Sequence, residues 1–386
     1  MKSYIGIGSS KKQVRELLGE PSRSDVNFWT YGTSHIKFSS SGFVVAWKNM
    51  FGELSKAFQP YIPTEEKLSL GQSKAQVIEV LGAPTAIIDA IPEEWKYEGA
   101  HVKFDKNDKV CEWKNVYDQI SYGLLQAEDS DDYIDIGTSK EKVLKILGAP
   151  SMISALDHDT WYYQASHVKF KHNKVIEWKN QYDQLSFGMK KAEVVNGHLF
   201  IGASKHDVLT LLGSPTSVLS SNSNVWKYES SHILFENDRV IEWKSMFGQL
   251  NHGLKKAQGG VIRLGMHKDQ ILEILGSPDT VSKLNKDLWH YKSSHVFFIK
   301  DKLVEYRAGF HDFDIGLKRG SSHASDIDIG SSEEEVLERL GSPTAIFYRE
   351  TGVWHYGNAS VYFDNYMKVR SWQNIDDIKK KIKLEE

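Results

Sequence analysis

Histidine, glutamate and a basic residue recur together at fixed sequence distances along this chain. Each of four histidines is followed 10 or 11 residues later by a glutamate, and two residues after that by a lysine or arginine. An imidazole, a carboxylate and a cation at one surface can pair with each other, hold a charged partner or bind a metal. The candidate partner-binding residues are His101, Lys103, Glu112, Lys114, His167, Lys169, Glu177, Lys179, His232, Glu242, Lys244, His295 and Glu305.

The spacing predicts how these residues meet across a hairpin. If each hairpin pairs symmetrically about its turn, His101 lies directly opposite Glu112, and the same register holds for the three later copies. In the end copies His35 would face Ala46 and Ser360 would face Ser371. A facing glutamate should raise the pKa of the histidine. Two interpretations remain open: cross-strand pairs on a solvated face, each worth about 0.2–1 kcal/mol, and a periodic stripe that binds a partner.

Other chemistries are disfavoured by the same repetition. Each copy supplies one such histidine and the chain has a single cysteine, Cys111, so we expect no metal and no cofactor. Gly6 and Gly8 ahead of a helix are reminiscent of a nucleotide-binding loop, but the other copies lack a glycine equivalent to Gly6. A catalytic site is normally a unique constellation, whereas nearly every notable residue here recurs. We therefore expect no enzymatic activity.

The elements that position these side chains come from an internal repeat of about 65 residues. Its lead glycines are Gly8, Gly71, Gly137, Gly202, Gly265 and Gly330. A second glycine follows each by 11 residues, and a proline comes two residues later: Pro21, Pro84, Pro150, Pro215, Pro278 and Pro343. All 11 tryptophans mark equivalent positions, namely Trp29, Trp95, Trp161, Trp226, Trp289 and Trp354, then Trp47, Trp113, Trp178, Trp243 and Trp372, with Tyr306 in the fifth copy.

Each repeat reads as one short helix followed by strands. Ser10 with Gln13, Ser73 with Gln76, and Ser332 with Glu335 have the spacing of a capping box, and the second glycine ends the helix. Three stretches, 95–97, 101–104 and 110–114, alternate apolar and polar residues with period two. The tryptophans and Cys111 fall on the apolar face, which we expect to lie under the helix, and the His/Glu/Lys residues fall on the other face.

This pattern predicts an α+β fold of six tandem repeats, each a short helix and a three-stranded antiparallel meander, stacked in a compact or curved array. The predicted repeats span residues 1–63, 64–129, 130–194, 195–258, 259–323 and 324–386. One helix on three strands makes a thin core, so two indoles per repeat suit it, each worth on the order of 2–3 kcal/mol when buried.

Four motifs carry a resemblance to a known superfamily. They are Ile136-Gly137-Thr138-Ser139-Lys140, Leu147-Gly148-Ala149-Pro150, Trp161-Tyr162-Tyr163 and Val175-Ile176-Glu177-Trp178-Lys179-Asn180, with their counterparts in the other copies. The chain resembles the superfamily of β-lactamase inhibitor protein and the small outer-membrane assembly lipoproteins. It is also similar to short glycine-rich tandem repeats of Gram-positive bacteria. The resemblance implies helix-plus-meander units and, as a special case, an inhibitory role. The chain departs from it in lacking paired cysteines, a signal sequence and a lipobox.

Composition limits the kind of partner. The 48 basic residues are matched by 51 acidic ones, so we expect no nucleic-acid partner. No apolar stretch approaches the roughly 18 residues that cross a bilayer. We expect a cytoplasmic, non-enzymatic chain that binds a protein as scaffold, sequestering protein or inhibitor, with a secreted or cell-surface location as the alternative. A second function class is carbohydrate or cell-wall binding, which requires exposed tryptophans.

Overall fold

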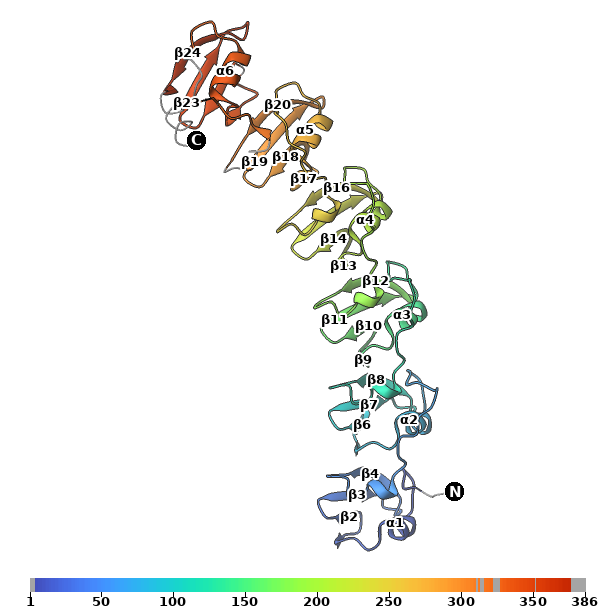
Figure 1. The fold of residues 1–386 in the computed structure, drawn as a ribbon. Helices are drawn as coiled ribbons and strands as arrows, with labels where there is room; N and C mark the ends of the chain where they lie inside the picture. Colours follow the sequence, from blue (N-terminus) through green and yellow to red (C-terminus); the bar gives the residue numbers. More distant parts are fainter. Residues whose placement is uncertain (1–3, 310–311, 313–315, 322–326, 351, 376–386) are drawn as a thin grey trace. The chain divides into compact units, whose positions relative to one another are not determined.

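The computed structural model describes residues 4–309, 312, 316–321, 327–350 and 352–375 (Figure 1). The chain divides into two compact units, residues 1–190 and 191–386, and each is described by itself. Each unit contains three copies of one supersecondary pattern, an α-helix followed by a meander. We number the copies repeats 1 to 6 in chain order, each beginning with its α-helix.

Unit 1 contains repeats 1 to 3. Its helices are α1 (Lys11–Leu18), α2 (Lys74–Leu81) and α3 (Lys140–Leu147), with 3₁₀ turns η1 (Ser55–Ala57), η2 (Ser121–Gly123) and η3 (Ser186–Gly188). Its strands are β1 (Arg23–Ser24), β2 (Phe28–Tyr31), β3 (Ser34–Phe38), β4 (Val44–Lys48), β5 (Ala86–Ile88), β6 (Glu93–Tyr97), β7 (Ala100–Phe104), β8 (Val110–Lys114), β9 (Met152–Ser154), β10 (Asp157–Tyr163), β11 (Ser166–Lys171) and β12 (Lys174–Lys179).

Unit 2 contains repeats 4 to 6. Its helices are α4 (Lys205–Leu212), α5 (Lys268–Leu275) and α6 (Glu333–Leu340), with the 3₁₀ turn η4 (Asn251–Gly253). Its strands are β13 (Ser217–Leu219), β14 (Asn222–Tyr228), β15 (Ser231–Glu236), β16 (Arg239–Lys244), β17 (Thr280–Ser282), β18 (Asn285–Tyr291), β19 (Ser294–Ile299), β20 (Lys302–Arg307), β21 (Ala345–Ile346), β22 (Val353–Tyr356), β23 (Ala359–Phe363) and β24 (Val369–Gln373).

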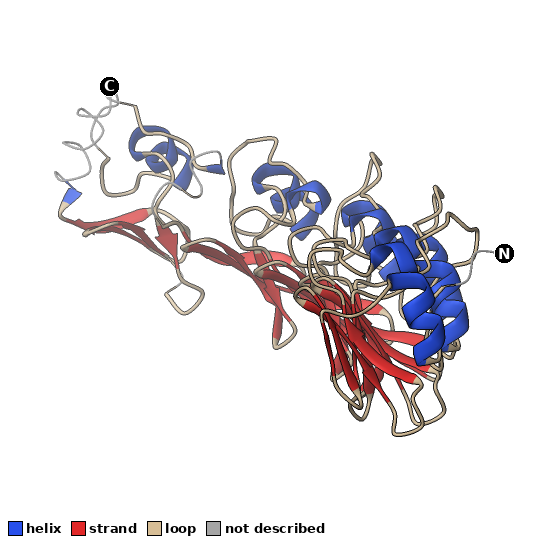
Figure 2. Cartoon of the chain, turned by 90° about the horizontal axis from the view of Figure 1, so that it is seen from below, coloured by secondary structure: helices blue, strands red, loops and turns tan. Residues whose placement is uncertain are grey.

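The helices form where the sequence predicts them. Capping boxes are present at Ser10, Ser73 and Ser332, and the second glycine of each repeat ends the helix at positive φ. Each helix has eight residues, which is too short to be stable without a sheet to pack on. In each unit the helices lie on one face of the sheet, and the opposite face carries no helix within the described residues (Figure 2).

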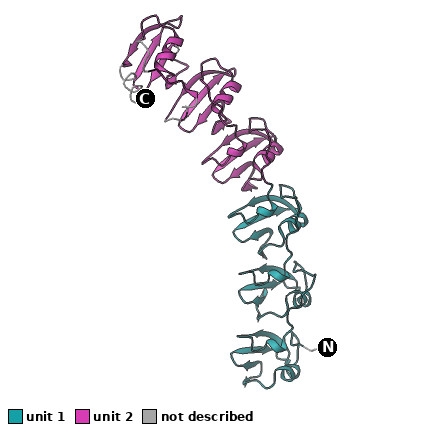
Figure 3. Ribbon diagram, in the orientation of Figure 1, with its two compact units in different colours: residues 1–190 teal, residues 191–386 magenta. Residues whose placement is uncertain are grey.

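The meander has one strand more than predicted. The three predicted strands are present in every repeat, and a short strand directly after the Gly-x-Pro motif precedes them. This short strand pairs with the last strand of the preceding repeat within each unit, as in the Trp113↔Ile153 pair of β8 and β9. Consecutive repeats of a unit therefore share one antiparallel sheet. The three repeats of unit 1 present their helices on the same side (Figure 3).

The core lies between the helix and the sheet, and the tryptophans fill it as predicted. Nine tryptophans are buried, with exposed fractions of 7% or less, and Trp289 is partly buried. The exception is Trp372 on β24, which is 39% exposed. Burial removes the tryptophans from the surface, where carbohydrate stacking would need them.

Candidate functional site

The His/Glu/Lys residues lie on the open face of the sheets. His101 and Lys103 are on β7 and Glu112 and Lys114 on β8, with the same placement on β11 and β12, β15 and β16, and β19 and β20. The histidines and glutamates are half-buried by their neighbours, whereas Lys114, Lys179 and Lys244 are exposed. We call this set, as predicted from the sequence, the polar face.

The predicted register across the hairpin is wrong. His101 lies directly opposite Lys114, and Glu112 lies opposite Lys103. The cause is a β-bulge at Cys111, which adds one residue to β8 and lets both Val110 and Trp113 face the core. The same bulge recurs in the other copies, so the histidine faces Lys179, Lys244 or Arg307. In the end copies His35 faces Lys48 instead of Ala46, and Ser360 faces Gln373 instead of Ser371.

The histidine and glutamate still touch, along the diagonal of the sheet. His101 Nε2 lies 3.1 Å from Glu112 Oε1. The equivalent Nε2–Oε1 distance is 3.4 Å in each of the pairs His167–Glu177, His232–Glu242 and His295–Glu305. Long side chains reach diagonal neighbours in an antiparallel sheet. The predicted partners were therefore right although the predicted register was not.

The second glutamate oxygen has a role that the sequence did not reveal. Oε2 of Glu112 accepts a hydrogen bond from the backbone N–H of Ala155 at 2.9 Å, in the next repeat. Glu242 accepts likewise from Lys283 at 3.0 Å, and Glu305 from Tyr348 at 3.0 Å. Each of these glutamates thus joins a histidine of its own repeat to the first hairpin of the following one. These glutamates of the polar face therefore stabilise the joint between consecutive repeats.

The pKa shifts in the pair of His101 and Glu112 also differ from the prediction. Burial opposes the charged form of Glu112, but the Ala155 amide, Lys103 and His101 outweigh it and lower the pKa of Glu112. The pKa of His101 is lowered, because burial outweighs the hydrogen bond to Glu112 and the attraction of Glu94. The expectation of a raised histidine pKa is therefore wrong for His101. Desolvation of the imidazole is the larger effect here.

We predict that His101 titrates below its ordinary pKa of 6.5. Its contribution to stability is then complete above pH 6.5 and is lost as the pH falls through the folded-state value, because the unfolded chain binds the proton first. Glu112→Gln should lower the pKa of His101 further, since the hydrogen bond to Glu112 is the main effect that raises it. NMR titration of the imidazole measures both values. A His101 pKa at or above 6.5 would contradict this assignment.

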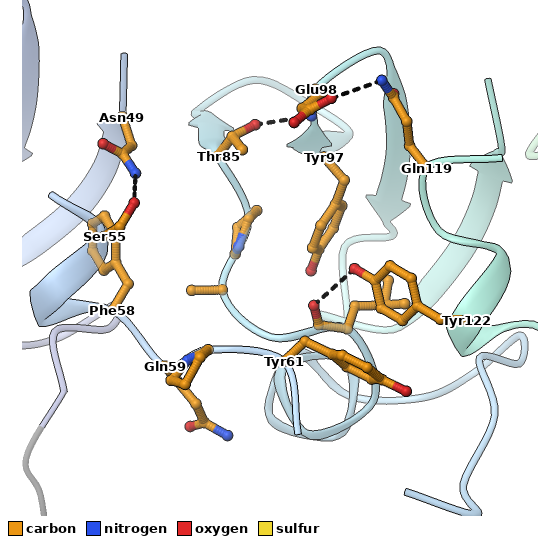
Figure 4. Close-up of a pocket in the computed structure, with 14 residues that line it drawn as sticks. Asn49, Ser55, Phe58, Gln59, Tyr61, Thr85, Tyr97, Glu98, Gln119 and Tyr122 are labelled. Carbon is orange, nitrogen blue, oxygen red and sulfur yellow. Dashed lines mark hydrogen bonds between the residues drawn. The ribbon is translucent and has the colours of Figure 1, made fainter. Parts of the chain in front are cut away.

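A groove of about 510 Å³ lies at the joint of repeats 1 and 2 and was not predicted (Figure 4). Phe58, Tyr61, Tyr97 and Tyr122 line it. The hydroxyls of Tyr97 and Tyr122 donate to the carbonyls of Gly82 and Leu81, so the rings present carbon to the groove. Glu98 is the single acidic residue among its lining residues, so the groove offers no pair of carboxylates for acid–base catalysis.

Cys111 is buried at the bulge, as expected for a packed thiol. Burial raises the pKa of the thiol, which disfavours the reactive thiolate. Within the described residues no three His, Cys, Asp or Glu side chains gather closely enough to hold a metal ion. The described part of the chain also holds no helix long and apolar enough to span a membrane.

The fold defines a repeat protein built from one helix-and-meander unit. The family model described as the outer membrane protein assembly factor BamE domain matches residues 127–182 and 254–297. The first segment contains α3 with β9 to β12, and the second contains α5 with β17 and β18. The match agrees with the resemblance to small outer-membrane assembly lipoproteins. Comparison with curated proteins and with solved structures gives no match.

Proposed function

We propose that this chain is a non-enzymatic scaffold that binds a protein partner through the polar face. The family match carries the proposal: the matched domain is described as that of an outer membrane protein assembly factor, and a factor that assembles proteins must contact them. The open sheet face supports it, because the face that carries no helix in the described residues presents the charged residues of the polar face in repeats 2 to 5. The description of the matched domain also favours the cell envelope over the cytoplasm as the location of this chain.

The exposed cations of the polar face should contribute more to recognition than its glutamates. Lys114 and Lys179 are exposed and have no ion-pair partner in the described chain, whereas Glu112 already holds His101 and the Ala155 amide. Unpaired cations steer a partner of complementary charge and fix its orientation. We therefore propose that the partner presents acidic groups to this face. Sequestration or inhibition of that partner would be a special case of the same binding.

Neutralising two lysines of the polar face tests the proposal. We expect Lys114→Gln with Lys179→Gln to reduce capture of the partner at least about tenfold, with folding retained, because each substitution removes an exposed, unpaired charge and keeps the length of the side chain. The measurement is affinity capture from the native host with the full chain as bait, quantified by mass spectrometry. Lys12→Gln with Lys142→Gln, on helices α1 and α3, is the matched control. Equal losses for the two double variants would refute the polar face as the binding surface.

A further inference from the structure

In each of repeats 1 to 4, one aromatic side chain stands almost fully exposed at the same position of the connector after the last strand. Phe51, Tyr117 and Tyr182 of unit 1 are 90%, 89% and 80% exposed, and Phe247 of unit 2 is 87% exposed. We call Phe51, Tyr117 and Tyr182 the aromatic row. Rings this exposed add almost nothing to the core of their own repeat. Both phenylalanine and tyrosine occur at this position, so the aromatic ring is common to the four copies and the hydroxyl is not.

The backbone at these positions is strained. All four residues have positive φ, between 47° and 53°. A bulky residue in this left-handed region is unusual and strained, while glycine, asparagine and aspartate adopt it readily. The chain thus keeps an aromatic ring where a smaller residue would favour folding. Strain retained in four copies indicates a use of the side chain outside the fold.

Hydrogen bonds hold the connector that carries the ring in repeats 2 and 3. Oε1 of Gln119, two residues after Tyr117, accepts from the N–H groups of Gly99 and Ala100 at 2.6 and 2.8 Å. Gln184 binds the turn of its own repeat in the same way. The connector is therefore docked on the adjacent hairpin, and the exposed ring projects from backbone that is held in place by these hydrogen bonds. A preorganised aromatic loses little entropy on binding, which makes it an effective interface anchor.

The spacing of the row limits what can bind all of it. Repeats 1 to 3 share one antiparallel sheet through the β4–β5 and β8–β9 pairs. Four strands per repeat at about 4.8 Å each place successive rings about 19 Å apart. A protein partner must therefore offer apolar sites with the same long period. A second copy of this chain has that period by construction.

Charge around the row is self-complementary. An exposed lysine and an exposed aspartate flank the ring in repeats 2 and 3, as Lys114 with Asp118 and Lys179 with Asp183. Two identical turns that face each other in antiparallel orientation bring each lysine toward the aspartate of the other copy. We propose that the aromatic row is a homodimer interface, in which Tyr117 meets Tyr117 of the second copy and Phe51 meets Tyr182. Such an isologous contact closes on itself.

Asparagine at the three ring positions tests the dimer without endangering the fold. We expect the full chain to dimerise at micromolar concentration in sedimentation equilibrium. The triple variant Phe51→Asn, Tyr117→Asn and Tyr182→Asn should weaken dimerisation on the order of 100-fold, as loss of central anchors does. Its thermal midpoint, measured at a dilution where the wild-type chain is monomeric, should be unchanged or higher, because asparagine relieves the backbone strain. Leu156→Asn, at a 98% exposed position outside the row, should leave the dimer intact.

Disulfide trapping tests the antiparallel arrangement. In a Cys111→Ala background, Tyr117→Cys should give a disulfide-linked dimer under mild oxidation. Phe51→Cys should do so only together with Tyr182→Cys. A wild-type chain that stays monomeric, or a dimer that the triple variant leaves unchanged, would overturn the proposal. So would a monomer that sediments with phosphatidylglycerol vesicles and loses this binding in the triple variant, since the rings would then serve a lipid surface.

Discussion

Trp113→Ala is expected to lower the free energy of unfolding by about 3–5 kcal/mol, the range for removing a buried aromatic side chain. Trp113 is 3% exposed and pairs with Ile153 of the next repeat. Its Nε1 donates a hydrogen bond of 3.0 Å to the carbonyl of Pro150. The substitution therefore removes core volume and a contact that joins repeats 2 and 3. Urea unfolding followed by circular dichroism measures the loss.

Trp372→Ala is the matched control, because it deletes the same side chain from the same position of repeat 6. Trp372 is 39% exposed, so we expect a smaller loss of about 1–2 kcal/mol. Trp113→Phe separates the two effects, since it keeps most of the ring and removes the donor. Equal losses from Trp113→Ala and Trp372→Ala would show that the contact with the next repeat contributes nothing.

The hydrogen bond from the second tryptophan of a repeat to the proline carbonyl of the next repeat explains why tyrosine can replace that tryptophan. Trp47 donates to the carbonyl of Pro84 at 2.9 Å, and Trp243 donates to that of Pro278 at 3.1 Å. In repeat 5 the hydroxyl of Tyr306 donates to the carbonyl of Pro343 at 3.0 Å. Tyrosine is thus an equivalent donor on a comparable ring. The proline of the Gly-x-Pro motif supplies the acceptor for the preceding repeat as well as ending the helix.

The sequence predicted the repeat and its elements but not the joints between repeats. Periodicity and capping report contacts close in sequence, so the eight-residue helices and the long strands follow from them. The first tryptophan is an intra-repeat core residue, as expected, and Trp95 packs on Phe104 at 4.7 Å between ring centroids. The second tryptophan binds a carbonyl 35 or 37 residues away. A single sequence gives no signal for such a contact, because both residues already have a local explanation.

The candidate site shows the same limit. The alternation of Cys111, Glu112, Trp113 and Lys114 favoured a regular hairpin, and it placed Glu112 and Lys114 on the face away from the core, where the structure has them. One bulge residue, Cys111, shifted the register and placed Lys114 opposite His101. Nothing in an apolar residue at that position distinguishes a bulge from an inward-facing strand residue. The binding role of the polar face stays a prediction, whereas its contribution to the joint follows from the Glu112 contact with Ala155.

Gly148→Ala should destabilise the chain by about 3–4 kcal/mol, the sum of left-handed backbone strain and overpacking. Gly148 ends α3 with a φ of 72°. A Cβ there would lie 2.8 Å from the backbone oxygen of Leu125 and 2.8 Å from the nitrogen of Ala127. These atoms belong to the connector of repeat 2, where Leu125 accepts a hydrogen bond from Ala149. Backbone atoms held in this way cannot move aside. Urea unfolding of the full chain measures the loss.

Gly19→Ala separates the effect of backbone strain at the helix end from the effect of the close contact between repeats. Gly19 ends α1 with a φ of 83°, and a Cβ there would meet no atom within 4 Å. Backbone strain alone should then cost about 1–2 kcal/mol. If Gly148→Ala and Gly19→Ala lowered the free energy of unfolding equally, the close approach of the connector to Gly148 would not contribute to stability. A larger loss at Gly148 would mean that the repeat glycine serves two purposes, ending its own helix and admitting the backbone of the repeat before it.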